Sequence, residues 1–138
     1  MNETSLIDTG FLFAVLDESD AKHPSCLAAF EYEDKALLPE IVLPELAYLL
    51  LKRGGYEVLS KFLRTVVAGD YSLVPTKLQD LERAAEILEK YADSNLDLVD
   101  CVIVAIAERL KIKRILTIDR RHFGIFRPRH CAAFEIIP

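Results

Sequence analysis

The sequence predicts an α/β protein in which helices cover both faces of a mostly parallel sheet. Short apolar runs that are typical of buried strands alternate along the chain with longer stretches that are typical of helices. Gly, Pro and Asp separate many of these segments, as expected of turns and helix ends. With 138 residues and no internal repeat or linker, the chain has the commonest size of one domain, and we expect a single domain over residues 1–138.

The first half of the chain is expected to begin with a strand and to continue mainly as helices. Pro44 and Glu45 suit a first helical turn, because proline needs no hydrogen-bond partner there and an acid faces the positive end of the helix dipole. The pair Gly54-Gly55 suits a helix end. In chain order we expect a strand at residues 5–7, helices at 10–16 and 22–33, an extended run at 36–42, a helix from Pro44 to Gly54 and a helix at 56–68.

The second half continues the alternation and contains the most apolar helix. Residues 77–92 carry apolar side chains at helical spacing between charged ones, and residues 96–110 are apolar almost throughout. Thr76 and Asn95 are placed to cap these two helices. The remaining expected elements are strands at 71–74, 114–118 and 133–137, and the apolar positions of the helix at 77–92 are Leu78, Leu81, Ala85, Leu88 and Tyr91.

The composition excludes a disordered or membrane-spanning chain. Hydrophobic residues make up 51% of the sequence and charged residues 28%. The longest apolar run, Cys101 to Ala107, is far shorter than the ~20 residues that cross a bilayer, and the acidic start lacks the basic region of a signal peptide. We therefore expect a cytoplasmic protein with no membrane partner. The cysteines form neither a disulfide framework nor a CxxC metal motif, and we expect them to act as small apolar residues.

The net charge of −5 hides an uneven distribution of charge. One segment near the end of the chain holds a single acid, Asp119, among eight basic residues. Such a segment usually forms a solvated face, but it can also hold phosphate groups. The basic residues are Arg109, Lys111, Lys113, Arg114, Arg120, Arg121, Arg127 and Arg129.

Four or five acidic side chains are expected to converge at one edge of the sheet. Asp8 and Asp119 each follow a predicted strand directly, and in an open α/β sheet the carboxyl ends of the strands form the crevice that binds ligands. Glu45 lies in the first turn of a helix that follows another strand. Asp97 and Asp100 share one face of the apolar helix, because residues three apart are neighbours on a helix surface.

Asp100 is the most informative of these acids, because it interrupts the apolar run from Leu98 to Val104. An ionised carboxylate buried there needs a partner, and a cation is the natural one. Carboxylate oxygens suit Mg²⁺ or Mn²⁺, whereas no Cys/His grouping in the sequence favours zinc. Such ions lower the pKa of bound water and stabilise the attacking and leaving oxygens of a phosphodiester. The residues therefore indicate metal-assisted phosphodiester hydrolysis.

Four segments of the chain resemble successive motifs of the PIN-domain family, in the order and spacing of VapC-type toxins. The resemblance covers essentially the whole chain, and four motifs in register are far more specific than any one alone. The segments are Leu6-Ile7-Asp8-Thr9, Pro44-Glu45, Asp97-Leu98-Val99-Asp100-Cys101 and Leu116-Thr117-Ile118-Asp119-Arg120-Arg121-His122-Phe123. Cys101 stands where many relatives carry alanine, a departure that leaves the acids untouched.

The resemblance implies a three-layer α/β/α PIN-like fold with a central, mostly parallel sheet of four or five strands. It implies an endoribonuclease that depends on Mg²⁺ or Mn²⁺ and acts as the toxin of a toxin–antitoxin pair. Proteins of this kind frequently form a homodimer. They are inhibited when the C-terminal segment of an antitoxin occupies the active groove.

The resemblance also implies roles for the acids. Asp8, Glu45, Asp100 and Asp119 match the family's acidic quartet by position, with Asp8 and Asp100 as the chief metal ligands. Glu45 and Asp119 would be ligands directly or through water. Asp97 is either a further ligand or a helix cap.

Residues next to the acids are expected to support them. Thr9 and Thr117 would donate hydrogen bonds, and Arg120 or Arg121 would reach a phosphate of the RNA unless they pair with surface acids. His122 is expected to be structural. The phenylalanines expected in the core rather than stacked on bases are Phe11, Phe13 and Phe123.

Alternatives to this interpretation stay open. Asp8, Asp97 and Asp119 could cap helices or start turns, and Glu45 could interact favourably with the positive end of a helix dipole. Capping explains Asp100 poorly, because by the predicted boundaries it lies past the first turn. The whole domain could also be a catalytically silent PIN-fold module that binds RNA or a partner protein. A phosphatase or a receiver domain ranks lower, because no lysine immediately follows the strand-end acids.

Overall fold

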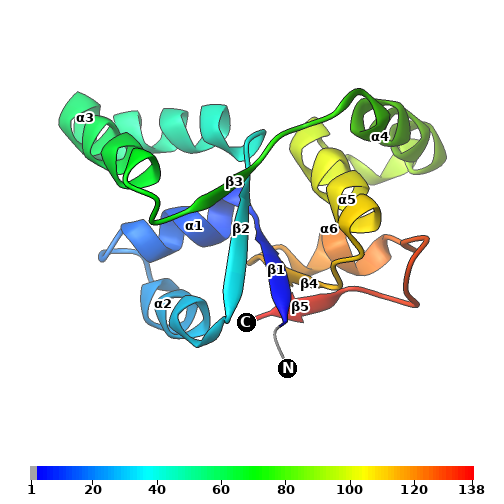
Figure 1. Ribbon diagram of the computed structural model, residues 1–138, viewed down its shortest axis with the longest axis horizontal. Coiled ribbons are helices and arrows are strands. Elements are labelled where there is room, and N and C mark those ends of the chain that lie inside the picture. The colour runs from blue at the N-terminus through cyan, green and yellow to red at the C-terminus, as the bar shows by residue number, and fades with distance from the viewer. Residues whose placement is uncertain (1–2) are drawn as a thin grey trace.

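The computed structural model describes residues 3–138, which form five strands, six α-helices and one short 3₁₀ helix (Figure 1). The strands are β1 (Thr4–Ile7), β2 (Lys35–Pro39), β3 (Ser72–Val74), β4 (Arg114–Leu116) and β5 (Glu135–Ile137). The helices are α1 (Thr9–Leu16), α2 (His23–Tyr32), α3 (Val42–Val67), α4 (Leu78–Lys90), the 3₁₀ helix η1 (Ala92–Ser94), α5 (Leu98–Leu110) and α6 (Arg120–Ile125).

The strands form one sheet in the order β3-β2-β1-β4-β5, and every pairing between neighbours is parallel. The chain moves outward from β1 to β2 and β3, and then returns to the other side of β1 to form β4 and β5. In an open parallel sheet, the crevice beside such a reversal of strand order is the usual ligand site. The strand order reverses here between β1 and β4, so the expected ligand site is at the carboxyl ends of these two strands. The predicted α/β class and parallel sheet are confirmed.

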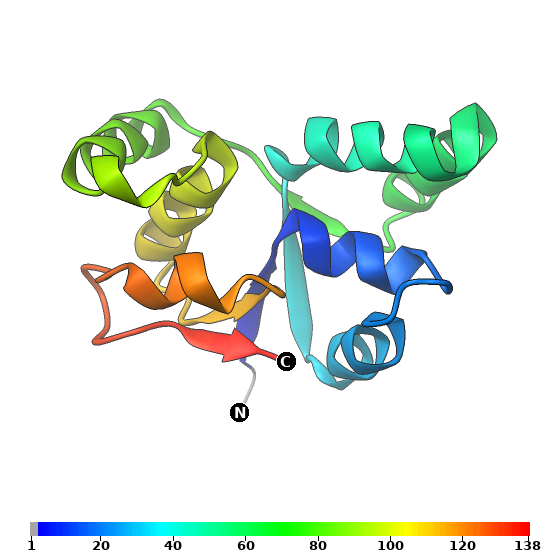
Figure 2. The ribbon, with the colours of Figure 1, turned by 180° about the vertical axis from the view of Figure 1, so that it is seen from behind.

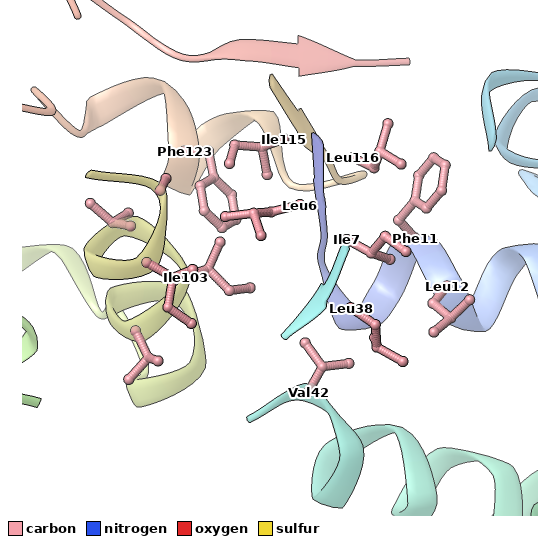
Figure 3. Packing of buried hydrophobic residues seen from close by; sticks show 14 of the residues in the cluster. Leu6, Ile7, Phe11, Leu12, Leu38, Val42, Ile103, Ile115, Leu116 and Phe123 are labelled. Atoms are coloured by element: carbon pink, nitrogen blue, oxygen red, sulfur yellow. The ribbon is translucent and has the colours of Figure 1, made fainter. Parts of the chain in front are cut away.

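Helices lie on both sides of the sheet, as the two opposite views show (Figures 1 and 2). Helices α1, α2 and α3 occupy one side, and α4, α5 and α6 the other. Successive side chains of a strand point to opposite faces, so β1 contributes to both halves of the core. Leu6 points toward Ile103 and Phe123, whereas Ile7 points toward Phe11 (Figure 3). All five side chains are buried, which confirms the predicted core positions of Phe11 and Phe123.

Two segments differ from the predicted boundaries. The extended run predicted at 36–42 is too long, because β2 ends at Pro39 and α3 already begins at Val42. A short apolar run does not by itself distinguish a strand from a buried helix start. The two helices predicted on either side of the glycine pair both lie within α3, which is broken at Gly55. The Gly55 φ of 78° and ψ of −171° are not helical, and glycine adopts them readily because it has no Cβ.

One helix and two helix caps were not predicted correctly. The short helix α6 was missed, because its six residues are too few to show the apolar periodicity that predicts a helix. The N-cap of α4 is Lys77 rather than Thr76, and the N-cap of α5 is Asp97 rather than Asn95. Asn95 instead takes a left-handed conformation, with a φ of 55°, directly after the 3₁₀ helix.

The buried face of α4 also differs from the predicted apolar stripe. Asp80, Ala84 and Ile87 are each 1% exposed, whereas Leu78 and Leu81 are 86% and 44% exposed. The prediction failed because a periodicity argument assigns a charged residue such as Asp80 to the solvent face. Helix α4 therefore keeps much of its leucine stripe on the surface.

Asp80 is buried because an arginine of α5 pairs with it. Its two carboxylate oxygens accept hydrogen bonds from Arg109, both at 2.9 Å, and Oδ2 also accepts the backbone N–H of Lys77 at 2.9 Å. A second pair, Arg83 with Glu108 at 2.7 Å, joins the same two helices. These contacts hold α4 against α5.

Replacing Asp80 with alanine is expected to lower the free energy of unfolding by about 3 kcal/mol, because it leaves the largely buried guanidinium of Arg109 without its partner. Urea unfolding followed by circular dichroism measures the loss. The matched control is Glu82→Ala on the exposed side of the same helix, which should change the stability by less than about 0.5 kcal/mol. Equal effects of the two substitutions would contradict a stabilising role for the buried pair.

All three cysteines are free thiols, and Cys26 and Cys101 lie in the core, as expected of small apolar residues. Cys131 is partly exposed. No helix within residues 3–138 is long and apolar enough to span a membrane.

Candidate metal-binding active site

Asp8 directly follows β1, at the point where the strand order reverses. The residue caps α1: Oδ1 accepts the backbone N–H of Thr9 at 2.8 Å, and Oδ2 accepts the hydroxyl of Thr117 at 2.8 Å. Asp8 is only 7% exposed. Burial raises its pKa to about 6, and the negative charges of Glu45 and Asp97 act in the same direction, against the lowering effect of the two hydrogen bonds.

The hydroxyl of Thr117 connects two of the acids. It donates to Asp8 and accepts the backbone N–H of Asp119 at 2.9 Å, so the hydroxyl is used both as donor and as acceptor. Thr117 is fully buried and directly follows β4. One hydroxyl therefore orients the Asp8 carboxylate and the turn that carries Asp119. The predicted hydrogen bond is observed, and its contribution to metal binding stays a prediction.

Thr117→Val keeps the shape of the side chain but removes the hydroxyl, and we expect it to weaken Mg²⁺ or Mn²⁺ binding by about 10–100-fold. Loss of a group that orients a metal ligand has effects of this size. Titration calorimetry with each ion measures the change. Thr117→Ser restores the hydroxyl and should recover most of the affinity. Equal losses in the valine and serine variants would show that the hydroxyl is not the cause.

Thr9 supports Asp8 through its backbone rather than its side chain. The backbone N–H donates to Asp8, whereas the hydroxyl oxygen is buried and finds no hydrogen-bond partner in the described part of the chain. A buried polar atom left unpaired costs about 1–3 kcal/mol, and native proteins usually satisfy it with water or an ion. The hydrogen-bonding support predicted from Thr9 is observed at its backbone N–H, and its contribution to metal binding stays a prediction.

Asp97 and Asp100 lie at the start of α5. Asp97 is the N-cap, and its Oδ1 accepts the backbone N–H of Asp100 at 2.8 Å. The cap is thus observed, and a further role of Asp97 as a ligand stays a prediction. One argument about Asp100 was wrong: because α5 begins at Leu98, Asp100 lies within the first turn rather than past it. Its position alone is therefore compatible with an ordinary helix-dipole contact.

Burial separates Asp100 from an ordinary acid of a first turn. The residue is 5% exposed, and no N–H or hydroxyl group of residues 3–138 donates a hydrogen bond to its carboxylate within normal geometry. Burial raises its pKa to about 8, and the negative charges of Asp97, Asp8 and Asp119 contribute to the rise. A carboxylate in these surroundings is stable as an anion only with a cation beside it.

Asp119 and His122 enter the cluster from α6. Asp119 is the N-cap of this helix, and its Oδ1 accepts the backbone N–H of His122 at 2.9 Å. The imidazole Nδ1 of His122 lies 2.7 Å from Asp119 Oδ2 and 3.4 Å from Asp100 Oδ2. The purely structural role predicted for His122 overlooks this contact. The spacing Asp119-x-x-His122 predicts the contact between these two side chains, once the segment is known to be helical.

Glu45 completes the set from α3. It is exposed in the first turn of that helix, and its charge raises the pKa of Asp8, so the two acids are within electrostatic reach. The charge of Asp97 acts on Asp8 and that of Asp119 acts on Asp100 in the same way. The structure therefore places ligand atoms of Asp100 and Asp119 within 4.8 Å of one another and of His122. Asp8, Asp97 and Glu45 lie within electrostatic reach of this group, and their role as ligands stays a prediction.

Most arginines of the basic segment contact other parts of the protein. Arg109 pairs with Asp80, Arg114 with Glu33 and Glu135, Arg120 with the carbonyl of Pro138, and Arg129 with Glu86. These residues serve the fold, as the ordinary interpretation of a basic segment expects. Arg121 is exposed and immediately follows the first residue of α6, and its predicted contact with a phosphate stays a prediction.

The donor atoms of the cluster suit a hard divalent cation. Carboxylate oxygens are the ligands that Mg²⁺ and Mn²⁺ take in proteins. The buried Asp100 carboxylate and the unpaired Thr9 hydroxyl are polar groups for which an ion and its water would supply partners. The residues present therefore fit the metal that the sequence predicts.

The resemblance to PIN domains implies a parallel sheet between two layers of helices, with acids where the strand order reverses. A comparison with protein families agrees with this assignment. The model of the family described as PIN domain matches residues 5–125, which include all five acids. The chain therefore belongs to the PIN-domain family. Within that family it is of the VapC type: Ribonuclease VapC26 of Mycobacterium tuberculosis is 33% identical over 134 residues, covering 96% of this chain and 99% of the relative.

Solved structures of VapC toxins share the fold. VapC20 of Mycobacterium tuberculosis, described as a sarcin-ricin loop cleaving toxin, aligns with a TM-score of 0.74 at 20% identity over 80% of this chain and 86% of that chain. A chain of VapBC2 from Rickettsia felis, solved bound to a DNA fragment from its promoter, aligns with a TM-score of 0.70 at 15% identity over 98% of this chain and 99% of its own length.

Proposed function

We propose that this protein is a Mg²⁺- or Mn²⁺-dependent endoribonuclease and the toxin of a toxin–antitoxin pair. One observation carries the proposal: the Asp100 carboxylate is buried beside Asp8, Asp97 and Asp119 at the point where the strand order reverses. Such a group of acids is costly for a folded protein without a cation. The name of the relative VapC26, a ribonuclease, supports RNA as the substrate.

The proposed chief ligands are Asp8 and Asp100, with Glu45 and Asp119 acting directly or through water. A bound ion supplies a water of lowered pKa and stabilises charge on the phosphodiester, so no covalent enzyme intermediate is needed. The protein orients the proposed ligand side chains. Thr117 fixes the Asp8 carboxylate, and the helix cap at Asp97 fixes the start of α5, so the ligands are placed before the ion arrives.

The proposed substrate is single-stranded or looped RNA, whose phosphates the exposed Arg121 would contact. The net charge of −5 makes a bridging cation important, because the acidic cluster by itself repels a phosphodiester. Arg120 is the second proposed contact, although its side chain donates to Pro138 in this structure.

An antitoxin is the proposed protein partner. The structural neighbours that support it are toxin–antitoxin assemblies, among them a complex from Klebsiella pneumoniae that aligns with a TM-score of 0.68 over 97% of this chain. In the proposed arrangement the C-terminal segment of the antitoxin occupies the groove over the acids and excludes RNA. An RNA cleavage assay with and without the co-expressed partner would show this inhibition.

A homodimer is the proposed oligomeric state. The support is the leucine stripe on α4, where Leu78, Leu81 and Leu88 are 86%, 44% and 38% exposed. One helix face that meets its own copy forms the self-complementary interface of a two-fold dimer. Sedimentation of the Leu81→Glu variant should give a monomer where the wild type gives a dimer, and a monomeric wild type would rule the dimer out.

The experiment that tests the function is cleavage of a panel of structured RNAs by purified protein in Mg²⁺, Mn²⁺ or EDTA, beside Asp8→Asn. Cleavage that needs metal and disappears in the variant would establish the nuclease. The inactive variant also controls for contaminating ribonucleases. Metal-bound, folded protein that binds RNA but never cuts it would instead support the silent binding module.

A further inference from the structure

We infer that His122 is a further ligand of the metal cluster, and that its Nδ1 joins Asp100 Oδ2 and Asp119 Oδ2 in a mixed nitrogen and oxygen subsite. The inference rests on the proposed metal dependence and adds a residue outside the acidic quartet. It also adds a chemical preference, because an imidazole ligand favours transition-metal ions over Mg²⁺.

The distances between the three side chains suit one shared ion. Their ligand atoms all lie within 4.8 Å of one another. Ligands at about 2.1 Å from an octahedral ion are separated by about 3 Å when adjacent and about 4.2 Å when opposite. The observed separations of Nδ1 from the two carboxylate oxygens, 2.7 Å and 3.4 Å, are close to the adjacent value.

Each of the three residues keeps one atom free for the ion. Asp119 uses Oδ1 to cap α6, which leaves Oδ2 beside the imidazole. The Asp100 carboxylate accepts no hydrogen bond from an N–H or hydroxyl group of the described residues. The Nδ1 atom of His122 is buried, and its direction meets normal hydrogen-bond geometry with neither acid despite the short distances.

A simple ion pair between His122 and Asp119 is the competing explanation. Such a pair would align the imidazole N–H with one carboxylate oxygen, and in this structure the ring nitrogen lies close to two acids from different helices. Asp100 is also 5% exposed, an environment in which an unpaired anion is costly. A shared cation accounts for all three side chains, whereas the ion pair accounts only for His122 and Asp119.

The test uses Mn²⁺ as the probe, because the electron spin of this ion detects nitrogen atoms bonded to it. Full-length protein loaded with Mn²⁺ should show the ¹⁴N modulation of a coordinated imidazole in pulsed electron paramagnetic resonance. Labelling histidine with ¹⁵N should change that signal. His122→Asn should lose it while still binding Mn²⁺ through the carboxylates, with an affinity lower by roughly 10-fold or more. Its affinity for Mg²⁺ should change less.

A matched control is His23→Asn, which alters a histidine that contacts the carbonyl of Ala14 outside the cluster and should leave the nitrogen signal intact. Bound Mn²⁺ without any ¹⁴N modulation in the wild type would overturn the inference and leave the proposed nuclease standing. Absence of Mn²⁺ and Mg²⁺ binding altogether would overturn both.

Discussion

Asp100→Asn is expected to slow RNA cleavage strongly and, at the same time, to stabilise the metal-free protein. The substitution keeps the size of the side chain and the backbone N–H that donates to Asp97, but removes the buried negative charge. A metal ion contributes several kcal/mol to such a reaction, so loss of a chief ligand should lower the cleavage rate on the order of 10³-fold.

The gain in stability follows from the surroundings of Asp100. In EDTA at pH 8 the wild-type protein must keep this acid protonated or hold an anion near Asp97, Asp8 and Asp119. Asparagine avoids both costs, and we expect the free energy of unfolding to rise by about 1–3 kcal/mol. Urea unfolding in EDTA measures it. Glu82→Gln, the same charge change on the exposed side of α4, should leave both activity and stability unchanged. A destabilised but folded Asp100→Asn protein would contradict the electrostatic argument.

The metal-free wild-type protein should lose stability as the pH rises from about 4 to 8. Burial raises the pKa of Asp8 to about 6 and that of Asp100 to about 8, both from 3.8. Above about pH 4 the unfolded chain has released both protons, whereas the folded chain retains the Asp8 proton up to about pH 6 and the Asp100 proton up to about pH 8. The stabilising contribution is therefore complete below pH 4 and is lost as the pH passes through 6 and then 8.

The expected slope is about 1–3 kcal/mol of unfolding free energy per pH unit, steeper below pH 6 than above it, measured by urea unfolding between pH 5 and 8 in EDTA. The negative charges of Glu45, Asp97 and Asp119 contribute to the two raised pKa values. Saturating Mg²⁺ should flatten the slope, because the ion replaces the protons on the acids. A double variant with asparagine at positions 8 and 100 should also be flat. A metal-free stability that rises over this range would refute the electrostatic explanation.

The fold class was predictable from the sequence, and so was the position of the acids next to strand ends and in the apolar helix, because both depend on local patterns. Apolar runs that end in Asp8 and Thr117-Ile118-Asp119 mark the carboxyl ends of two strands, and the topology of a parallel sheet then brings them together. The acid inside the apolar helix, Asp100, was recognisable because a charge in such a run is rare and costly.

The missed features depend on contacts between residues that are far apart in the chain. Asp80 looked like a solvent-facing acid, because the arginine that buries it lies 29 positions away. His122 looked like a turn residue, because its neighbour Asp100 comes from another helix. The start of α5 was placed too early, since Asn95 and Asp97 are both good caps and only the left-handed backbone at Asn95 decides between them.

The hydrogen bond between Thr117 and Asp8 joins residues that are 109 positions apart. A ribosome that adds about 5–20 residues per second needs roughly 5–20 s to proceed from the first of these residues to the second. During that time the nascent chain has β1 but lacks β4, the neighbouring strand, and the hydroxyl that orients the first acid. The growing polypeptide therefore cannot assemble its acidic centre until β4 and Thr117 have been synthesised.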